Sequence, residues 1–143
     1  MGAIDHYLDA SFLVALLTIE PFSFRALQYV RACTGGLIVS DFAAAEFASA
    51  ISRRVRIGQM PQAEGLLVLS ALEQWASNAA SGIQISSGDI ALAGTFLRRL
   101  DLPLRTPDAI HVAAADRLGA TLVTFDRRMA ANAAALSIPV VEP

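Results

Sequence analysis

Four acidic residues occupy positions in the sequence where their carboxylates could share one site. Asp9 and Asp126 each follow a short apolar run that is typical of a buried strand. Asp108 comes directly after Thr106-Pro107, a capping hydroxyl and a proline that are typical of a helix start. Glu46 lies within an otherwise apolar helical segment. Because glutamate is seldom buried without a partner, Glu46 either faces solvent or serves a site.

Each of these acids also has an ordinary structural interpretation. Asp108 can complement a helix dipole, Asp126 can occupy a turn, and Glu46 can be a solvated helix residue. Together, however, four converging carboxylates would repel one another unless a cation neutralised them. Oxygen ligands in a chain with only two histidines favour Mg²⁺ or Mn²⁺ over zinc. A site of this kind can catalyse the hydrolysis of phosphodiester bonds.

Short apolar segments alternate with helical ones along the chain. Strands are predicted at residues 5–9, 37–39, 83–85, 121–125 and 138–141. Helices are predicted from about residue 11, over 22–33, from 40 or 41 to 56, over 61–80, from 86 or 87 to 100, and over 106–119. This alternation predicts one domain over residues 1–143, a three-layer α/β/α sandwich around a central parallel sheet of four to five strands. Sites form at the carboxyl ends of such strands, where Asp9 and Asp126 are expected.

Composition restricts the classes of protein that this chain can be. With 143 residues, 55% of them hydrophobic and 17% charged, the chain can bury the core of one folded domain. Charged residues such as Asp41, Glu46 and Arg53 interrupt its most apolar region, so no membrane span is expected. The mean hydropathy is high for a soluble monomer, which favours a protein interface.

The N-terminal segment and the cysteine content favour a cytoplasmic protein. Asp5 and His6 stand where a signal peptide would have a basic start and an apolar run. Cys33 is the single cysteine of the chain, so an internal disulfide is impossible and a reducing compartment is suitable.

Four segments resemble the successive motifs of PIN-domain nucleases, and of the VapC-type toxins of bacterial type II toxin–antitoxin systems among them. These segments are Tyr7–Ser11, Val39–Glu46, Pro107–Ala115 and Thr121–Asp126. Each motif is weakly specific by itself, but four in this order are specific. The resemblance extends from Tyr7 to Asp126 and implies a single PIN domain.

The resemblance also implies a function and a set of ligands. It implies that Asp9, Glu46, Asp108 and Asp126 bind one or two Mg²⁺ or Mn²⁺ ions. It implies endonucleolytic cleavage of structured RNA (tRNA, rRNA or mRNA) and inhibition by a cognate antitoxin protein. The sequence leaves open which RNA is cut, whether DNA is cut, and how many ions are bound.

Two hydroxyl residues are further candidates. Ser11, two residues after Asp9, could hydrogen-bond a phosphate or simply start a helix. Thr124 lies on the same side of its predicted strand as Asp126 and could orient a carboxylate.

A histidine and an arginine complete the candidates. His111 follows Asp108 by about one helical turn on the same face, as a packed core residue or as part of the site. Arg53 shares a helical face with Glu46 and could contact a substrate phosphate, or it could be solvated.

Two other functions fit parts of the pattern. A phosphoaspartyl phosphatase or receiver-type domain also has an aspartate after its first strand, but these proteins use a lysine and this chain has none. The segment Asp9-Ala10-Ser11 also lacks the second acid that such phosphatases place two residues after the nucleophile. A non-catalytic module for RNA or protein binding on the same fold is the other alternative. Clustered carboxylates would give an RNA-binding scaffold no advantage.

Two apolar helices predict an assembly. The helix from Pro61 carries more apolar residues than one face can bury, namely Leu66, Leu67, Leu69, Leu72 and Trp75. The helix after Pro21 carries Phe22, Phe24, Leu27 and Val30. These surfaces are expected to form a homodimer and a groove for the antitoxin.

Overall fold

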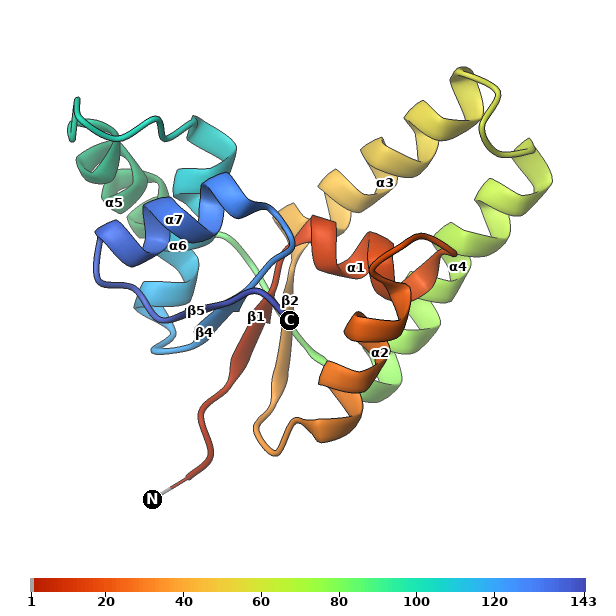
Figure 1. Cartoon of the computed structure of the whole chain (residues 1–143), viewed down its shortest axis with the longest axis horizontal. Coiled ribbons are helices and arrows are strands. Elements are labelled where there is room, and N and C mark those ends of the chain that lie inside the picture. The colour runs from red at the N-terminus through yellow and green to blue at the C-terminus, as the bar shows by residue number, and fades with distance from the viewer. Residues whose placement is uncertain (1) are drawn as a thin grey trace.

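A parallel β-sheet forms the centre of the computed structural model, which describes residues 2–143 (Figure 1). Within these residues the sheet has five strands in the order β3-β2-β1-β4-β5, and every neighbouring pair is parallel. The strands are β1 (His6–Leu8), β2 (Leu37–Ser40), β3 (Ser81–Ile83), β4 (Thr121–Val123) and β5 (Val140–Val141). The predicted parallel sheet is therefore confirmed.

Helices cover both faces of the sheet, as predicted for a three-layer sandwich (Figure 1). One group consists of α1 (Ala10–Leu17), α2 (Ser23–Ala32), α3 (Asp41–Arg56) and α4 (Gln62–Ala79). The other group consists of α5 (Ser87–Leu97), α6 (Thr106–Arg117) and α7 (Arg127–Ala135). In the part of the chain described here, none of these helices is long and apolar enough to cross a membrane.

Strand alternation divides the hydrophobic core between the two faces. Leu8, Val39 and Val123 belong to the core cluster that also contains buried residues of α1, α3 and α4. Their neighbours Tyr7 and Leu122 belong to a second cluster with residues of α6 and α7. Because successive side chains of a strand point to opposite faces, Tyr7 is directed toward α6.

Helices α1, α3 and α7 begin at the same edge of the sheet. Asp9 follows β1 and caps α1, Ser40 ends β2 and caps α3, and Asp126 follows β4 and caps α7. In each case a side-chain oxygen accepts hydrogen bonds from backbone N–H groups of the first helical turn. The capping residues are thereby held at the carboxyl ends of the strands, where sites form in parallel sheets.

Several predicted boundaries were wrong. The third strand lies at Ser81–Ile83 rather than 83–85, because the Ile85 N–H donates to Asp41 and Ser86 already caps α5. Helix α5 ends at Leu97 rather than at residue 100, and a turn follows in which the N–H of Leu102 donates to the carbonyl of Arg99.

The start of α6 and the presence of α7 also differ from the prediction. Arg105 is the N-cap residue of α6 and makes no side-chain cap, so Thr106 is the first helical residue and not the predicted capping hydroxyl. Helix α7 (Arg127–Ala135) was not predicted. Its sequence is rich in alanine and has few large apolar residues, so a helical period is hard to recognise there.

Candidate active site

The four predicted acids line one cavity at the carboxyl ends of the strands. This cavity, called the acid cavity below, has a volume of about 340 Å³ and contains Asp9, Glu46, Asp108 and Asp126 in its lining. Asp9 and Asp126 come from the ends of β1 and β4, Glu46 from α3 and Asp108 from the first turn of α6. The fold therefore brings together residues that are more than 100 positions apart in the chain.

Asp9 is the most constrained of the four acids. It is only 2% exposed, and both of its carboxylate oxygens accept hydrogen bonds. Oδ1 accepts from Ser11 Oγ at 2.7 Å and from the Phe12 N–H at 2.9 Å, and Oδ2 accepts from Thr124 Oγ1 at 2.6 Å. Burial raises the pKa of Asp9, although these hydrogen bonds act to lower it.

Ser11 and Thr124 connect Asp9 to the turn that carries Asp126. Each hydroxyl has one proton, which is used toward a different oxygen of Asp9. Their oxygens are then free to accept from the backbone, Ser11 from Phe125 N–H at 3.0 Å and Thr124 from Asp126 N–H at 2.9 Å. The two hydroxyls thus fix the position of Asp126 relative to Asp9.

Asp108 has the least satisfied carboxylate. It is 4% exposed, and among the described residues its Oδ2 is the one buried side-chain oxygen or nitrogen without a hydrogen-bond partner. The nearest cation is Arg105, whose Nε lies 3.7 Å from that oxygen, too far for a hydrogen bond. Burial, followed by the charge of Asp126, raises the pKa of Asp108, and Arg105 partly offsets this.

Glu46 reaches across from α3 to His111. Its Oε1 is paired with His111 Nε2, whereas Nδ1 of the same imidazole lies 2.8 Å from the hydroxyl of Tyr7. Tyr7 OH in turn lies 2.7 Å from Ser40 Oγ. His111 is 1% exposed, so this predicted site candidate is a buried residue that contacts the site through Glu46.

The arginine predicted to contact the substrate does not line the acid cavity, but another arginine does. Arg53 is exposed and is not part of the cavity lining, whereas Arg105 lines the cavity beside Asp108. Arg105 was not predicted as a site residue. Its position directly before Thr106-Pro107-Asp108 was the signal in the sequence that could have indicated it.

The donor set of the acid cavity fits a hard divalent cation. As the side chains lie, no three His, Cys, Asp or Glu residues among residues 2–143 are arranged to hold a metal ion. Nevertheless, Asp108 Oδ2 has no hydrogen-bond partner, and both N–H donors to Asp126 use its Oδ1, leaving Oδ2 of Asp126 available. A shared cation would offset both the burial and the charge of Asp126 that raise the pKa of Asp108.

A parallel sheet with a carboxylate-lined cavity at its strand ends defines a class of α/β protein in which the site is built from loops and helix starts. Comparison with known families identifies which member of that class this chain is. The family model described as PIN domain matches residues 6–135, so the chain belongs to the PIN-domain family.

Individual relatives cover the whole chain. Over its full length the chain is 33% identical to Ribonuclease VapC46 of Mycobacterium tuberculosis, of which the match covers 99%. One similar solved structure is that of Mycobacterium tuberculosis VapC20, described as a sarcin-ricin loop cleaving toxin. The match covers 96% of this chain and 99% of the VapC20 chain, with a TM-score of 0.75 and 17% identity. A toxin-antitoxin complex from Klebsiella pneumoniae matches 96% of this chain and 97% of its own with a TM-score of 0.62 and 22% identity. At these identities the two solved structures support the fold alone.

Proposed function

We propose that this protein is a Mg²⁺- or Mn²⁺-dependent endoribonuclease and the toxin of a toxin–antitoxin pair. The observation that carries the proposal is the acid cavity, whose lining contains four acidic residues and in which Asp108 Oδ2 has no hydrogen-bond partner. The 33% identity to a protein named as a ribonuclease, over the whole chain, supports RNA as the substrate.

Asp9, Glu46, Asp108 and Asp126 would hold the cation. When bound, such an ion supplies positive charge that stabilises the phosphoryl transition state and makes an attacking water more acidic. Asp9 contributes a carboxylate whose position is set by three hydrogen bonds, and Asp108 contributes one whose Oδ2 has no hydrogen-bond partner. The fixed geometry lowers the cost of arranging these groups when substrate binds.

Arg105 is the residue best placed to bind the substrate phosphate. Its side chain is 65% exposed, and it lines the acid cavity next to Asp108. An arginine in this position can contact phosphodiester oxygens and neutralise their charge.

The partners are inferred from exposed apolar side chains. Phe24 and Leu27 on α2 and Leu66 and Leu67 on α4 are exposed. Such surfaces are typical of protein interfaces, and we assign them to a second copy of the chain and to an antitoxin. A protein of similar fold was solved as a toxin-antitoxin complex, which supports an antitoxin partner.

Cleavage of a mixture of tRNA, rRNA and mRNA by the purified protein tests the proposal. Cleavage should require Mg²⁺ or Mn²⁺, stop with chelator, and fall at least ~100-fold in Asp108→Asn, since an unpartnered ligand is lost. Asp116→Asn, on the exposed side of the same helix, is the matched control and should cut like the parent. Equal cleavage by Asp108→Asn and the parent would contradict the assignment.

A further inference from the structure

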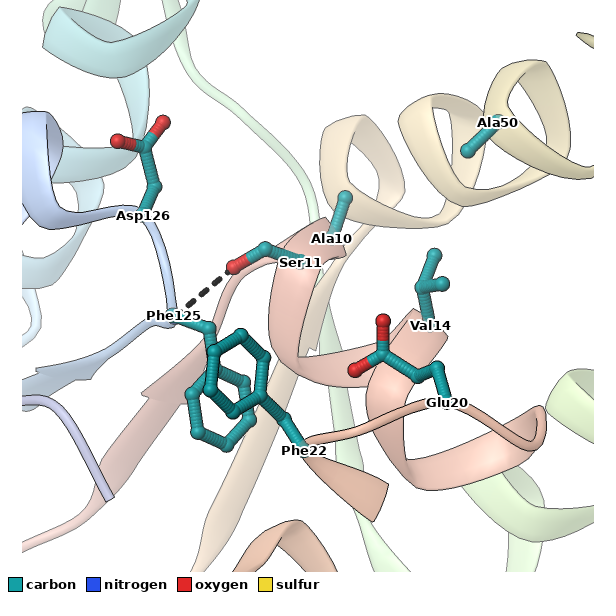
Figure 2. Close-up of a pocket in the computed structure, with 8 residues that line it drawn as sticks. All are labelled: Ala10, Ser11, Val14, Glu20, Phe22, Ala50, Phe125 and Asp126. Carbon is teal, nitrogen blue, oxygen red and sulfur yellow. Dashed lines mark hydrogen bonds between the residues drawn. The ribbon is translucent and has the colours of Figure 1, made fainter.

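A second cavity, whose lining residues are drawn in Figure 2, shares part of that lining with the acid cavity. It has a volume of about 310 Å³, and Ala10, Ser11 and Asp126 belong to the lining of both cavities. A nucleotide whose phosphate lies in the acid cavity therefore has this second cavity as an immediate neighbour for its base. We call it the side pocket.

Aromatic rings form one wall of the side pocket. The rings of Phe22 and Phe125 are stacked, with centroids 4.8 Å apart and planes within 5° (Figure 2). Behind Phe125 the fully buried ring of Phe12 continues the stack at 5.7 Å. This anchored stack offers a flat apolar surface, and unpaired bases bind on such surfaces.

Two carboxylates line the side pocket, and Glu20 is the one that does not also line the acid cavity. Its backbone N–H donates to Ser23 Oγ, which fixes the turn before α2. In Figure 2 its carboxylate points back toward the rings of Phe22 and Phe125. A carboxylate only accepts hydrogen bonds, so it selects a base with N–H donors.

Guanine fits this acceptor best among the four bases. It presents two adjacent donors, N1–H and the N2 amino group, which match the two oxygens of one carboxylate. Adenine and cytosine each present a single amino donor beside a ring acceptor, and uracil presents one donor between two carbonyls. An acceptor of those bases would face the negative charge of Glu20.

Arg25 adds positive charge on the outside of the aromatic stack. Its guanidinium carbon lies 5.2 Å from the Phe22 ring centre and 5.7 Å from that of Phe125. The guanidinium therefore lies against both rings of the stack. From there the exposed arginine can contact the next phosphate of a bound strand.

We propose that the side pocket binds an unpaired guanine next to the phosphodiester that is cut, and so selects the cleavage position. The proposal rests on the ribonuclease function proposed above. A side chain of a protein partner is the other possible occupant. The shared lining favours a base, because any phosphodiester in the acid cavity brings a base to this position.

Replacement of guanine by inosine tests the contact with Glu20. Inosine lacks the N2 amino group, so at one nucleotide flanking the cut it should lower kcat/KM of the parent about tenfold, the effect of losing one charge-assisted hydrogen bond. Glu20→Gln should cut the guanine and inosine RNAs at nearly equal rates. Glu73→Gln, an exposed glutamate on α4, should discriminate like the parent.

A second pair of variants tests the aromatic wall. Phe22→Leu keeps apolar volume but removes the ring, and it should raise KM for the RNA about tenfold with little change in kcat. Leu100→Ala changes an exposed leucine that lines neither cavity and should leave KM unchanged. Melting temperatures of both variants verify that they are folded.

The outcomes separate this proposal from the ribonuclease function. Equal cleavage of guanine and inosine RNAs by the parent, or full discrimination by Glu20→Gln, overturns the guanine site. The guanine site is also overturned if Glu20→Gln and Phe22→Leu alter only the binding of a protein partner and leave RNA cleavage unchanged. Absence of any RNA cleavage by the parent refutes the ribonuclease function instead. In that case, NMR shifts of the Phe125 amide measure the binding of guanosine 5′-monophosphate. Binding to the parent but not to Glu20→Gln still supports the pocket, and equal binding to both proteins overturns it.

Discussion

His111 connects Glu46 in the acid cavity to Tyr7 in the core of the sheet. A carboxylate cannot donate, so the proton between them belongs to His111 Nε2. In the neutral imidazole, Nδ1 then accepts from Tyr7 OH, and the Tyr7 oxygen accepts from Ser40. With the protons placed in this way, Glu46, His111, Tyr7 and Ser40 each have a hydrogen-bond partner, and Ser40 Oγ also accepts from the Ala43 N–H. One oxygen of Glu46 is thereby held in place, and Oε2 remains available to the cavity.

Substitution of His111 should weaken the site through Glu46. His111→Leu removes the donor and should lower both cleavage and Mn²⁺ affinity about tenfold, as found when groups that orient metal ligands are lost. His111→Gln retains an N–H donor and should recover most of the Mn²⁺ affinity. Titration calorimetry with Mn²⁺ measures this without RNA. If His111→Leu bound Mn²⁺ like the parent, a positioning role for His111 would be excluded.

Asp108→Asn should stabilise the metal-free protein. The substitution removes a buried charge whose Oδ2 has no hydrogen-bond partner and whose pKa burial and Asp126 raise more than Arg105 lowers it. The parent should gain about 2.7 kcal/mol from Mn²⁺ at 100 times its dissociation constant, and the variant much less. Asp9→Asn is a poorer test, because an amide cannot accept all three hydrogen bonds that Asp9 receives. Identical melting temperatures of parent and Asp108→Asn, with and without Mn²⁺, would contradict the prediction.

The stability of the metal-free protein should increase as the pH is lowered. Burial raises the pKa of Asp9, and burial together with Asp126 raises that of Asp108. In the unfolded chain both carboxyl groups titrate at about pH 3.9, so above that pH the folded state holds more protons than the unfolded state. The free energy of unfolding should therefore fall as the pH rises from about 4 through the raised pKa values. Urea unfolding with chelator measures it, and saturating Mn²⁺ should flatten the dependence. A flat profile in the absence of metal would contradict the raised pKa values of Asp9 and Asp108.

The ion pair between Asp89 and Arg117 should show the opposite dependence on pH. Burial acts to raise the pKa of Asp89, but hydrogen bonds from Arg117 and Ser86 outweigh it and the pKa is lowered. Arg117→Met should destabilise the protein by about 2–3 kcal/mol, less than for a fully buried pair because Arg117 is 39% exposed. The loss should be largest above about pH 4 and shrink as the pH falls through the lowered pKa. Arg128→Met, an exposed arginine, is the control, and equal stability of the two variants would contradict the prediction.

Assembly can be tested at the exposed apolar surface of α4. The chain has a mass of 15.1 kDa, and light scattering after size exclusion should give twice this value for the parent at micromolar concentration. The double change Leu66→Glu and Leu67→Glu introduces charges on two exposed leucines and should yield the monomer. A parent protein that is monomeric at these concentrations would rule out this homodimer.

Local patterns in the sequence determined the class of fold and the identity of the acids. Alternation of short apolar runs with helical segments is a local property, and it predicted the parallel sheet correctly. Asp9 and Asp126 were recognised because each ends an apolar run, and parallel strands must present such ends at one edge. Helix α7 was missed because an alanine-rich segment carries little periodic signal.

Only the tertiary structure decided how the acids are held and which arginine lies beside them. The contact between Glu46 and His111 joins residues 65 positions apart, and that between Asp9 and Thr124 joins residues 115 apart. Such contacts depend on β1 lying between β2 and β4 and on the register of those strands, which no local pattern encodes. For the same reason Arg53 lies outside the acid cavity although it shares a helical face with Glu46. Arg105 lines the cavity because α6 packs against the sheet.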